Sequence, residues 1–288
     1  MYAITGITGK VGGAMARALL AAGQPVRAVV RDATKGQPWA ALGCEVAIAA
    51  MEDAEALTQA FKDATAVFIL PPPVFDPEPG YPEARAVIDS VVTALRAAKP
   101  VKVVCLSTVG ADAVQDNLLS QRTMMETALR ALPQALTILR PAWFLDNVAW
   151  DVTSAREAGL IHSFLVPTDR ALPMVAAQDV GQVAAALIRQ DWSGTRIVEL
   201  EGPERLSPDD LAAAFTTVLG KPVCAAPVPR ETWEVLFRSQ GMRNPQPRMR
   251  MLDGFNEGWI AFADETRTIK GTISAAAVVA ALVAGEGA

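Results

Sequence analysis

A glycine-rich turn close to the N-terminus constrains the fold of this chain more than any other feature. It lies between an apolar run at residues 2–5, predicted to be a strand, and residues 13–22, predicted to be a helix. Glycines in such a strand–turn–helix unit are typical of a dinucleotide-binding turn, although an ordinary glycine turn is the alternative. The turn reads Thr5-Gly6-Ile7-Thr8-Gly9-Lys10-Val11-Gly12.

The three glycines of the turn have distinct expected roles. Gly6 allows the tight turn, Gly9 lets the backbone approach a pyrophosphate, and Gly12 lets the helix pack closely on the strand. Amide groups at the start of the helix then face the phosphates at the favourable end of the helix dipole. A P-loop is excluded, because Lys10 is followed by Val11 and not by serine or threonine.

The residue after the second predicted strand, at residues 26–30, indicates which dinucleotide binds. Proteins that bind NAD usually place an acidic residue here, on the ribose 2′-hydroxyl. This chain has Arg31, with Lys35 shortly after it and Lys10 in the glycine turn. Because a guanidinium group suits a 2′-phosphate, we predict that NADP(H) is preferred over NAD(H). A solvated basic turn is the alternative, and an Asp32 carboxylate that points inward would weaken the preference.

Short apolar runs alternate with helix-like segments through the first half of the chain. Nearly continuous apolar strands that alternate with helices are typical of a parallel sheet covered on both faces. We therefore predict an α/β fold with a Rossmann-like, doubly wound parallel sheet in an NADP-binding domain over residues 1–150. The further predicted strands are residues 45–48, 66–70, 101–107 and 137–139, and the further helices are residues 53–62, 82–98 and 121–132.

The alternation loosens in residues 151–288, which we predict to form a smaller, mostly helical C-terminal cap that binds substrate. A strand near residues 197–200 is expected to return to the main sheet, and Ser207, followed by proline and two aspartates, marks a helix start. Because ligands of open parallel sheets bind beyond the carboxyl ends of the strands, such a cap would close a cleft there. The other expected elements are a strand and turn at residues 224–230 and helices at residues 230–240, 249–257 and 274–284.

Composition excludes several classes of protein. The 288 residues include 26 basic and 31 acidic ones without a concentrated positive run, so a nucleic-acid partner is not expected. The most apolar late segment, residues 275–285, is too short to span a bilayer, and the N-terminus shows no basic leader. Three scattered cysteines and one histidine fit no metal site. We therefore expect a cytoplasmic protein with neither a metal ion nor a membrane partner.

Three further segments, together with the glycine turn and Arg31, carry a family resemblance. They resemble the NmrA-like group of atypical short-chain dehydrogenase/reductases, and the similarity extends over nearly the whole chain. That group includes NADP-sensing regulators without catalysis, quinone reductases and triphenylmethane-dye reductases. The segments are Leu-Ser-Thr-Val-Gly at residues 106–110, Thr-Ile-Leu-Arg-Pro-Ala-Trp-Phe-Leu-Asp-Asn at residues 137–147, and Gly-Trp-Ile-Ala-Phe at residues 258–262.

The resemblance also implies which residues contact NADP(H). They lie in the glycine turn, among the basic residues after the second strand, and in the loops that follow later strands. No flavin and no metal ion are expected. The implied contacts are Gly6, Thr8, Gly9, Lys10, Val11, Gly12, Arg31, Lys35, Leu70, Pro71, Pro72, Ser107, Pro141, Trp143 and Phe144.

The chain departs from the catalytic pattern of short-chain dehydrogenases. Typical members carry Tyr-x-x-x-Lys, in which the tyrosine is the acid/base and the lysine lowers its pKa. The corresponding segment, residues 118–126, contains neither residue, and Tyr81 with Arg85 mimics the spacing by coincidence in another unit. Arg122 occupies the position of the motif's lysine. It is either an exposed helix arginine or a group that binds ribose hydroxyls or a substrate oxygen. Its guanidinium cannot act as a proton donor near neutral pH.

A few side chains remain as candidates for orienting a substrate. Ser107 and Thr108 stand where the family's serine would orient a carbonyl, although a hydroxyl there can also cap a turn. The resemblance implies that Asn147 and Asp146 line the pocket. His162 is expected to be structural or to lie in the pocket wall, not in a Ser-His-Asp triad. An aromatic wall is expected from Trp143, Phe144, Trp150, Phe164 and Trp233.

These observations predict an NADPH-dependent oxidoreductase that transfers hydride to a conjugated acceptor such as a quinone, an azo compound or a dye. Without Tyr-x-x-x-Lys, positioning in a dry apolar cleft has to supply most of the rate. The alternative is a non-catalytic, NADP(H)-sensing regulatory protein, which the missing motif favours. The expected partner is a small aromatic or conjugated substrate, and the chain is expected to be a monomer or a homodimer.

Overall fold

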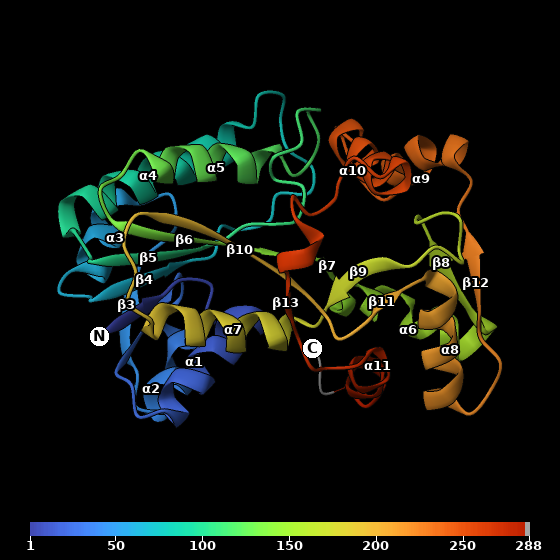
Figure 1. Ribbon diagram of the computed structural model, residues 1–288, viewed down its shortest axis with the longest axis horizontal. Helices are drawn as coiled ribbons and strands as arrows, with labels where there is room; N and C mark the ends of the chain where they lie inside the picture. The colour runs from blue at the N-terminus through green and yellow to red at the C-terminus, as the bar shows by residue number, and fades with distance from the viewer. Residues whose placement is uncertain (286–288) are drawn as a thin grey trace.

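An eight-stranded, entirely parallel sheet forms the centre of the molecule (Figure 1). The computed structural model describes residues 1–285. The strands lie in the order β13-β10-β6-β5-β4-β1-β2-β3, which confirms the predicted doubly wound α/β fold. The strands are β1 (Tyr2–Ile4), β2 (Val26–Val30), β3 (Glu45–Ile48), β4 (Ala66–Ile69), β5 (Lys102–Leu106), β6 (Ala135–Pro141), β10 (Thr195–Glu201) and β13 (Ile269–Lys270).

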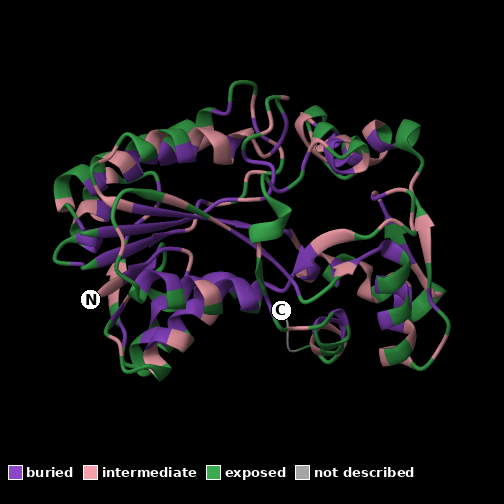
Figure 2. Cartoon of the chain, viewed as in Figure 1, coloured by how far each residue is buried: buried purple, intermediate pink, exposed green. Residues whose placement is uncertain are grey.

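Helices cover both faces of this sheet, and the strands between them are largely buried (Figure 2). In Figure 1, α1, α2 and α7 lie below the sheet, whereas α3, α4 and α5 lie above it. Each face has its own cluster of buried apolar side chains, as expected for a parallel sheet between two helical layers. The helices are α1 (Lys10–Ala21), α2 (Ala33–Ala41), α3 (Ala54–Phe61), α4 (Pro82–Ala98), α5 (Ser120–Arg130) and α7 (Ala177–Arg189).

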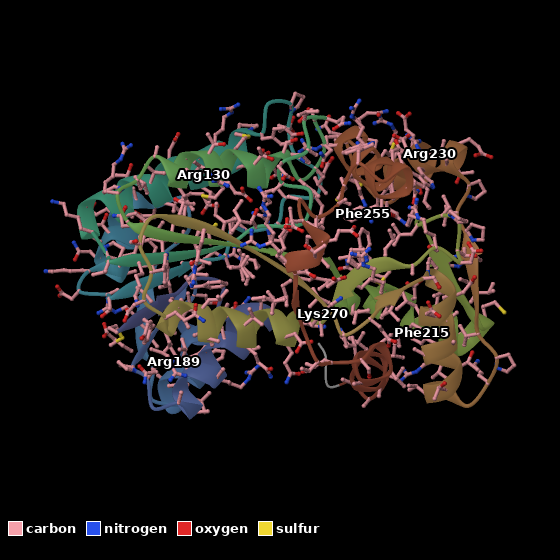
Figure 3. All side chains as sticks on the ribbon, in the orientation of Figure 1. Arg130, Arg189, Phe215, Arg230, Phe255 and Lys270 are labelled. Carbon is pink, nitrogen blue, oxygen red and sulfur yellow. The ribbon has the colours of Figure 1, made fainter. Side chains whose placement is uncertain are left out.

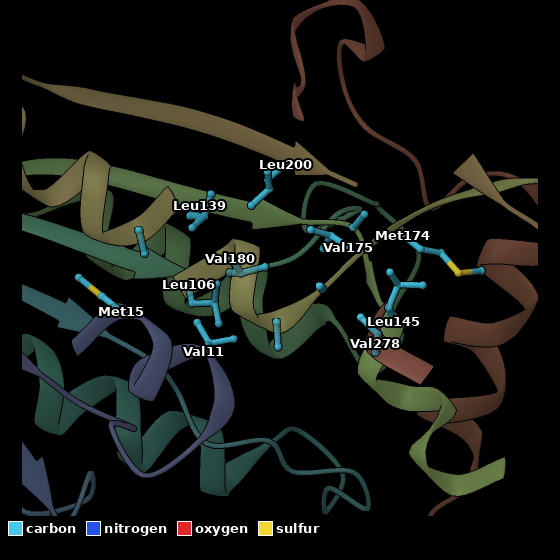
Figure 4. Packing of buried hydrophobic residues seen from close by; sticks show 14 of the residues in the cluster. Val11, Met15, Leu106, Leu139, Leu145, Met174, Val175, Val180, Leu200 and Val278 are labelled. Atoms are coloured by element: carbon cyan, nitrogen blue, oxygen red, sulfur yellow. The ribbon is translucent and has the colours of Figure 1, made fainter. Parts of the chain in front are cut away.

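Helices α1 and α7 pack against each other with very little space between them. A Cβ atom on Gly181 of α7 would lie 2.5 Å from the carbonyl oxygen of Val11 and 2.6 Å from the Cβ atom of Ala14. Glycine is therefore required at position 181 for this helix pair. Val11 and Met15 of α1 and Val180 of α7 belong to the cluster of buried apolar residues below the sheet (Figure 4). This packing fixes the position of the glycine turn that precedes α1.

The rest of the chain builds the cap, and it contains two small sheets that the predicted, mostly helical cap did not include. One small sheet has the order β11-β9-β7 and the other pairs β12 with β8. The cap strands are β7 (Trp143–Phe144), β8 (Leu160–Ser163), β9 (Leu172–Val175), β11 (Arg205–Leu206) and β12 (Cys224–Pro227). The cap helices are α6 (Val152–Ala158), α8 (Pro208–Leu219), α9 (Trp233–Ser239), α10 (Gln246–Glu257) and α11 (Ala275–Val283), with 3-10 segments η1 (Leu145–Asp151), η2 (Arg230–Thr232) and η3 (Glu265–Arg267).

The chain passes between the main sheet and the cap several times. After β6 it enters the cap through β7, and it returns to the sheet with α7, β10 and, near its end, β13. The division into residues 1–150 and 151–288 stays a prediction. None of the helices in residues 1–285 has both the length and the apolar character that crossing a membrane requires.

Candidate functional site

The start of α1 is built to receive an anion. Gly9 precedes the helix in an extended conformation and offers no side chain to cap it, and the first turn of α1 contains no acidic residue. The next two helices, α2 and α3, are each capped by their own aspartates, Asp32 and Asp53. The amide groups at the start of α1 therefore have no side-chain acceptor of their own, which fits the pyrophosphate of a dinucleotide.

The glycines of the turn divide into two kinds. A Cβ atom on Gly12 would lie 2.4 Å from the carbonyl oxygen of Gly6, so this position has to be glycine for the turn to close. A Cβ atom on Gly9 would meet only that same oxygen, at 3.4 Å, so the space above Gly9 is open. Gly6 itself has a φ of 64°, in the left-handed region that favours glycine. This arrangement agrees with close packing at Gly12 and ligand approach at Gly9.

The basic residues after β2 lie on the surface beside the turn. Arg31 and Lys35 are exposed, and within residues 1–285 neither forms an ion pair. The Asp32 carboxylate accepts the hydroxyl and the backbone N–H of Thr34, and these hydrogen bonds lower its pKa. Asp32 is exposed and caps α2 in this way, so its carboxylate does not point into the protein interior. The preference for NADP(H) over NAD(H) stays a prediction.

A cavity of about 900 Å³ opens at the carboxyl ends of β4, β5 and β6, between the sheet and the cap. Leu70 connects it to the glycine turn: Leu70 donates its N–H to the Thr5 hydroxyl at 2.8 Å, and its Cβ atom lies 3.1 Å from where a Gly6 Cβ would be. The glycine turn, Arg31 and Lys35 are outside the cavity lining, and Pro72 lines a separate small void. The predicted residues that line the cavity are Leu70, Pro71, Ser107, Thr108, Arg122, Pro141, Trp143, Phe144 and Asn147.

Ser107 is held by a buried ion pair. Its hydroxyl donates to Glu126, whose carboxylate accepts two hydrogen bonds from the Arg140 guanidinium at 2.9 and 2.8 Å. All three residues are buried. Because its one proton is used in this network, Ser107 can accept a hydrogen bond from a ligand but cannot also donate one. The Thr108 hydroxyl, also in the lining, makes no hydrogen bond within the described chain.

Arg122 lies in the cavity wall and is not the exposed helix arginine that the sequence allowed. It is half-buried on α5 and donates one long hydrogen bond, 3.5 Å, to the carbonyl oxygen of Pro72. Burial lowers the pKa of its guanidinium. Glu83 lines the small void on the other side of Arg122, but within residues 1–285 no carboxylate oxygen comes within 4.0 Å of this guanidinium.

The aromatic wall differs from the prediction at one residue. Trp143, Phe144, Trp150 and Phe164 line the cavity. Trp233 does not: it is 1% exposed and packs in a separate core with Phe237, Met249 and Leu252. Its place on α9, one helical turn before Phe237, explains this, because both rings then point to the same buried side of the helix.

Helix α10 supplies cavity residues that sequence reasoning missed. Phe255 of α10 is labelled in Figure 3. Its ring meets the Trp143 ring of β7 edge to face, with ring centres 5.1 Å apart. Phe75, in the loop after β4, is another missed lining residue and is 51% exposed. Nothing local in the sequence distinguishes these aromatic residues from ordinary core residues. Also missed on α10 are Arg248, Met251 and Leu252.

Two residues considered for catalysis are engaged elsewhere. Tyr81 is buried outside the cavity lining, and its hydroxyl donates to Asp116 at 2.8 Å and contacts the carbonyl oxygen of Asn117 at 3.0 Å. Burial and the Asp116 carboxylate raise the pKa of Tyr81. His162 lines the cavity, but Asp151 accepts its backbone N–H and not a ring nitrogen, so no hydrogen-bonded triad forms. Within residues 1–285, no cluster of His, Cys, Asp and Glu could hold a metal ion.

The glycine turn and the loops after the strands thus lie next to the apolar cavity, an arrangement that could hold a dinucleotide. Residues 2–254 match the model of the NmrA-like family. The chain belongs to the NmrA-like family. The resemblance inferred from the sequence motifs is confirmed, and it includes both the turn and the loops around the cavity.

Curated relatives of this NmrA-like protein are oxidoreductases. The NAD(P)H azoreductase of Xenophilus azovorans is 26% identical over 251 residues, which cover 84% of this chain and 82% of the relative. Quinone oxidoreductase 2 of Escherichia coli is 26% identical over 246 residues, with the same coverage of 84% and 82%. This similarity confirms the predicted oxidoreductase class.

Solved structures share the fold of this NmrA-like protein over almost its whole length. The NADPH complex of the Escherichia coli quinone oxidoreductase has a TM-score of 0.81 at 24% identity and covers 98% of this chain and 99% of its own. The triphenylmethane reductase of a Citrobacter species has a TM-score of 0.78 at 22% identity, again with 98% and 99% coverage. At these identities the structural likeness shows the fold.

Proposed function

We propose that this NmrA-like protein is an NADPH-dependent reductase that transfers hydride to a flat, conjugated acceptor. The observation that carries the proposal is the cavity of about 900 Å³, which is lined mainly by apolar and aromatic side chains and joined to the glycine turn through Leu70. A cavity of this size accommodates a cofactor ring together with a planar substrate. The named activities of the azoreductase and quinone oxidoreductase relatives support the same reaction type.

The proposed cofactor contacts follow from the geometry of the turn and of the strand ends. The amides at the start of α1 bind the pyrophosphate above Gly9, and Arg31 with Lys35 binds the 2′-phosphate. When bound, NADPH supplies the hydride. Leu70, Pro71, Pro141, Trp143 and Phe144 then shape the part of the cavity that holds the nicotinamide end.

The cavity wall offers no Tyr-Lys pair, so the acceptor itself has to accommodate the added charge. Its titratable lining residues are Arg122, Asp151, His162 and Arg248 in the described chain. Burial raises the pKa of Asp151, and one oxygen of its carboxylate accepts the backbone N–H of His162. A conjugated acceptor spreads the charge over its ring, gains its proton from water, and needs only an orienting hydroxyl such as that of Thr108. The acceptor is reduced by two electrons, and NADPH is released as NADP⁺.

The test is NADPH oxidation by the purified protein with a panel of neutral acceptors. We expect 1,4-naphthoquinone to be reduced and a plain ketone, cyclohexanone, to be a poor substrate. Efficient reduction of cyclohexanone would contradict the proposed mechanism. Tight NADPH binding with no turnover of any acceptor would instead favour the NADP(H)-sensing alternative, which the absent Tyr-x-x-x-Lys motif supports.

A further inference from the structure

Two arginines face the large cavity without a carboxylate partner. Arg122 reaches the wall from α5 and Arg248 reaches it from α10. Of the other cap arginines nearby, Arg230 pairs with Asp253 and Arg238 pairs with Glu234, whereas Arg250 is exposed and donates to the carbonyl oxygen of Asp116. A cation in a largely apolar wall is unfavourable unless an anion meets it, because desolvation penalises the unpaired charge. The unpaired state of these two arginines therefore needs an explanation.

The surroundings of Arg248 are almost entirely apolar. Its guanidinium carbon lies 4.4 Å from the centre of the Phe237 ring and 5.8 Å from that of Trp150. Its hydrogen bond within the described chain goes to the sulfur of Met242 at 3.7 Å, and burial lowers its pKa. A sulfur acceptor is weak, so most of the hydrogen-bonding capacity of this guanidinium is available to a ligand.

The two arginines approach the cavity from elements that are joined to each other. Leu118 donates its backbone N–H to the carbonyl oxygen of Pro247 at 2.9 Å. Arg122 lies four residues after Leu118, in the first turn of α5, and Arg248 is the residue after Pro247. Among the lining residues, Asp151 is the one carboxylate, and it already accepts the His162 N–H. Basic groups thus outnumber acidic ones in the wall.

The cofactor phosphates do not account for this charge in the proposed arrangement. Their expected contacts, the α1 amides, Arg31 and Lys35, all lie outside the cavity lining. The remaining ligand of the cavity is the acceptor, and the exposed aromatic rings of Phe75 and Trp150 at 51% and 67% exposure offer flat surfaces for it. We propose that the acceptor is a planar aromatic molecule with an anionic substituent, a carboxylate or a sulfonate, which Arg122 and Arg248 bind. This inference rests on the proposed reductase function, and the anionic substituent takes no part in the bond changes.

Binding of a matched pair of unreactive probes tests this inference separately from catalysis. Naphthalene-2-sulfonate and the neutral naphthalene-2-sulfonamide are titrated by calorimetry into the full-length protein saturated with NADP⁺. We expect the sulfonate to bind at least about tenfold more tightly, the range for a hydrogen bond to a charged group. Equal binding of the two probes, or no binding of the sulfonate, would overturn the inference.

Variants identify the groups that confer the preference. Arg122→Gln and Arg248→Gln are each expected to lower sulfonate affinity about tenfold and to leave sulfonamide affinity within about threefold. Arg238→Gln is the matched control, because Arg238 lies on α9 outside the cavity lining and is expected to keep the preference. If both arginine variants retained the sulfonate preference, or lost NADPH affinity to the same extent, the assignment would be wrong. Sulfonate binding without turnover of naphthoquinone would reject the reductase function and leave the anion site intact.

Discussion

The ammonium nitrogen of Lys10 lies 3.2 Å from a carboxylate oxygen of Asp146, and this ion pair joins the glycine turn to η1 at the entrance to the cap. The other Asp146 oxygen accepts the backbone N–H of Ala177, the first residue of α7, at 2.8 Å. Asp146 therefore connects three segments that surround the cofactor-type site. The sequence predicted Lys10 as a phosphate contact, and its ammonium charge is already compensated by this carboxylate.

Replacing Lys10 tests whether the ion pair or a phosphate contact dominates. Because both partners are partly exposed, we expect Lys10→Gln to lower the free energy of unfolding by at most about 1 kcal/mol. The ratio of NADPH to NADH affinity should stay within about threefold of the wild type, measured by fluorescence titration. A selective loss of NADPH affinity would show that Lys10 leaves Asp146 to bind the 2′-phosphate.

Arg31, unlike Lys10, is expected to contribute selectively to NADPH affinity, because no carboxylate of the described chain forms an ion pair with it. Arg31→Ala should weaken NADPH binding by about 1.5–3 kcal/mol and leave NADH binding nearly unchanged. Arg96→Ala, an exposed arginine on α4, provides the control for a general loss of positive charge. Equal losses for both dinucleotides would contradict the 2′-phosphate assignment.

The two kinds of glycine in the turn separate cofactor binding from folding. Gly9→Ala should leave the unfolding free energy within about 0.5 kcal/mol, since its Cβ has room, but lower NADPH affinity about tenfold or more. Gly12→Ala should instead cost about 1–3 kcal/mol of stability, because its Cβ would lie 2.4 Å from the Gly6 oxygen. Thermal unfolding and NADPH titration of both variants check this. Unchanged NADPH affinity in Gly9→Ala would mean that the turn has only a structural role.

The sequence predicted every strand of the main sheet except β13, and it did not predict every helix that covers the sheet. Strands β2 and β3 agree with prediction to the residue. The buried strand β2 is a mostly apolar run, whereas β3 is a partly exposed edge strand in which Val46, Ala47 and Ile48 form a short apolar run. Helix α2 was missed since it contains Gly36 and Pro38, which are poor helix residues, and α7 was missed since Gly181 interrupts its apolar face. Both helices form because tertiary packing, not propensity, stabilises them. The two-residue strands of the cap leave too short a pattern to detect.

Long-range pairing limited the prediction of the site more than motif recognition did. On α5, Glu126 stands four residues after Arg122, a spacing that favours an ion pair between them. In the structure Glu126 pairs with Arg140 of β6 instead, and this buried pair lies beside Ser107. Arg122 therefore does not pair with Glu126 and lines the cavity. Which carboxylate meets which guanidinium depends on the sheet register and the tilt of α5, and no local pattern contains that information.

Ser107 and Thr108, the two hydroxyl residues after β5, are predicted to differ: replacing Thr108 should lower the turnover rate, and replacing Ser107 should lower the stability. Thr108→Val should leave stability nearly unchanged and lower the turnover rate with naphthoquinone about tenfold, less than loss of a full oxyanion-hole donor, because the acceptor delocalises charge. Ser107→Ala should remove about 1.5–3 kcal/mol of stability, because Glu126 loses a hydrogen bond. Its turnover per folded molecule should change only a few fold. A collapse of turnover in Ser107→Ala alone would show that Ser107 contacts the substrate directly.

Asp76 gives a pH-dependent prediction, because it fastens the loop after β4 to the segment between α9 and α10. Its carboxylate accepts the backbone N–H groups of Arg243 at 2.9 Å and Asn244 at 2.6 Å. Partial burial raises the pKa of Asp76, but these hydrogen bonds and the Arg243 charge outweigh it and lower the pKa. A pKa that is lower in the folded protein than in the unfolded chain contributes stability above the ordinary aspartate value of about 3.9, and this stability is lost as the pH falls through the folded value.

We therefore expect Asp76→Asn to be less stable than wild type by about 1–2 kcal/mol at pH 7, and the difference to shrink below about pH 4. Urea unfolding across this pH range measures it, with Asp89→Asn on the exposed face of α4 as the control. A difference that stayed constant down to acidic pH would show that the hydrogen bonds of Asp76 do not depend on its charge.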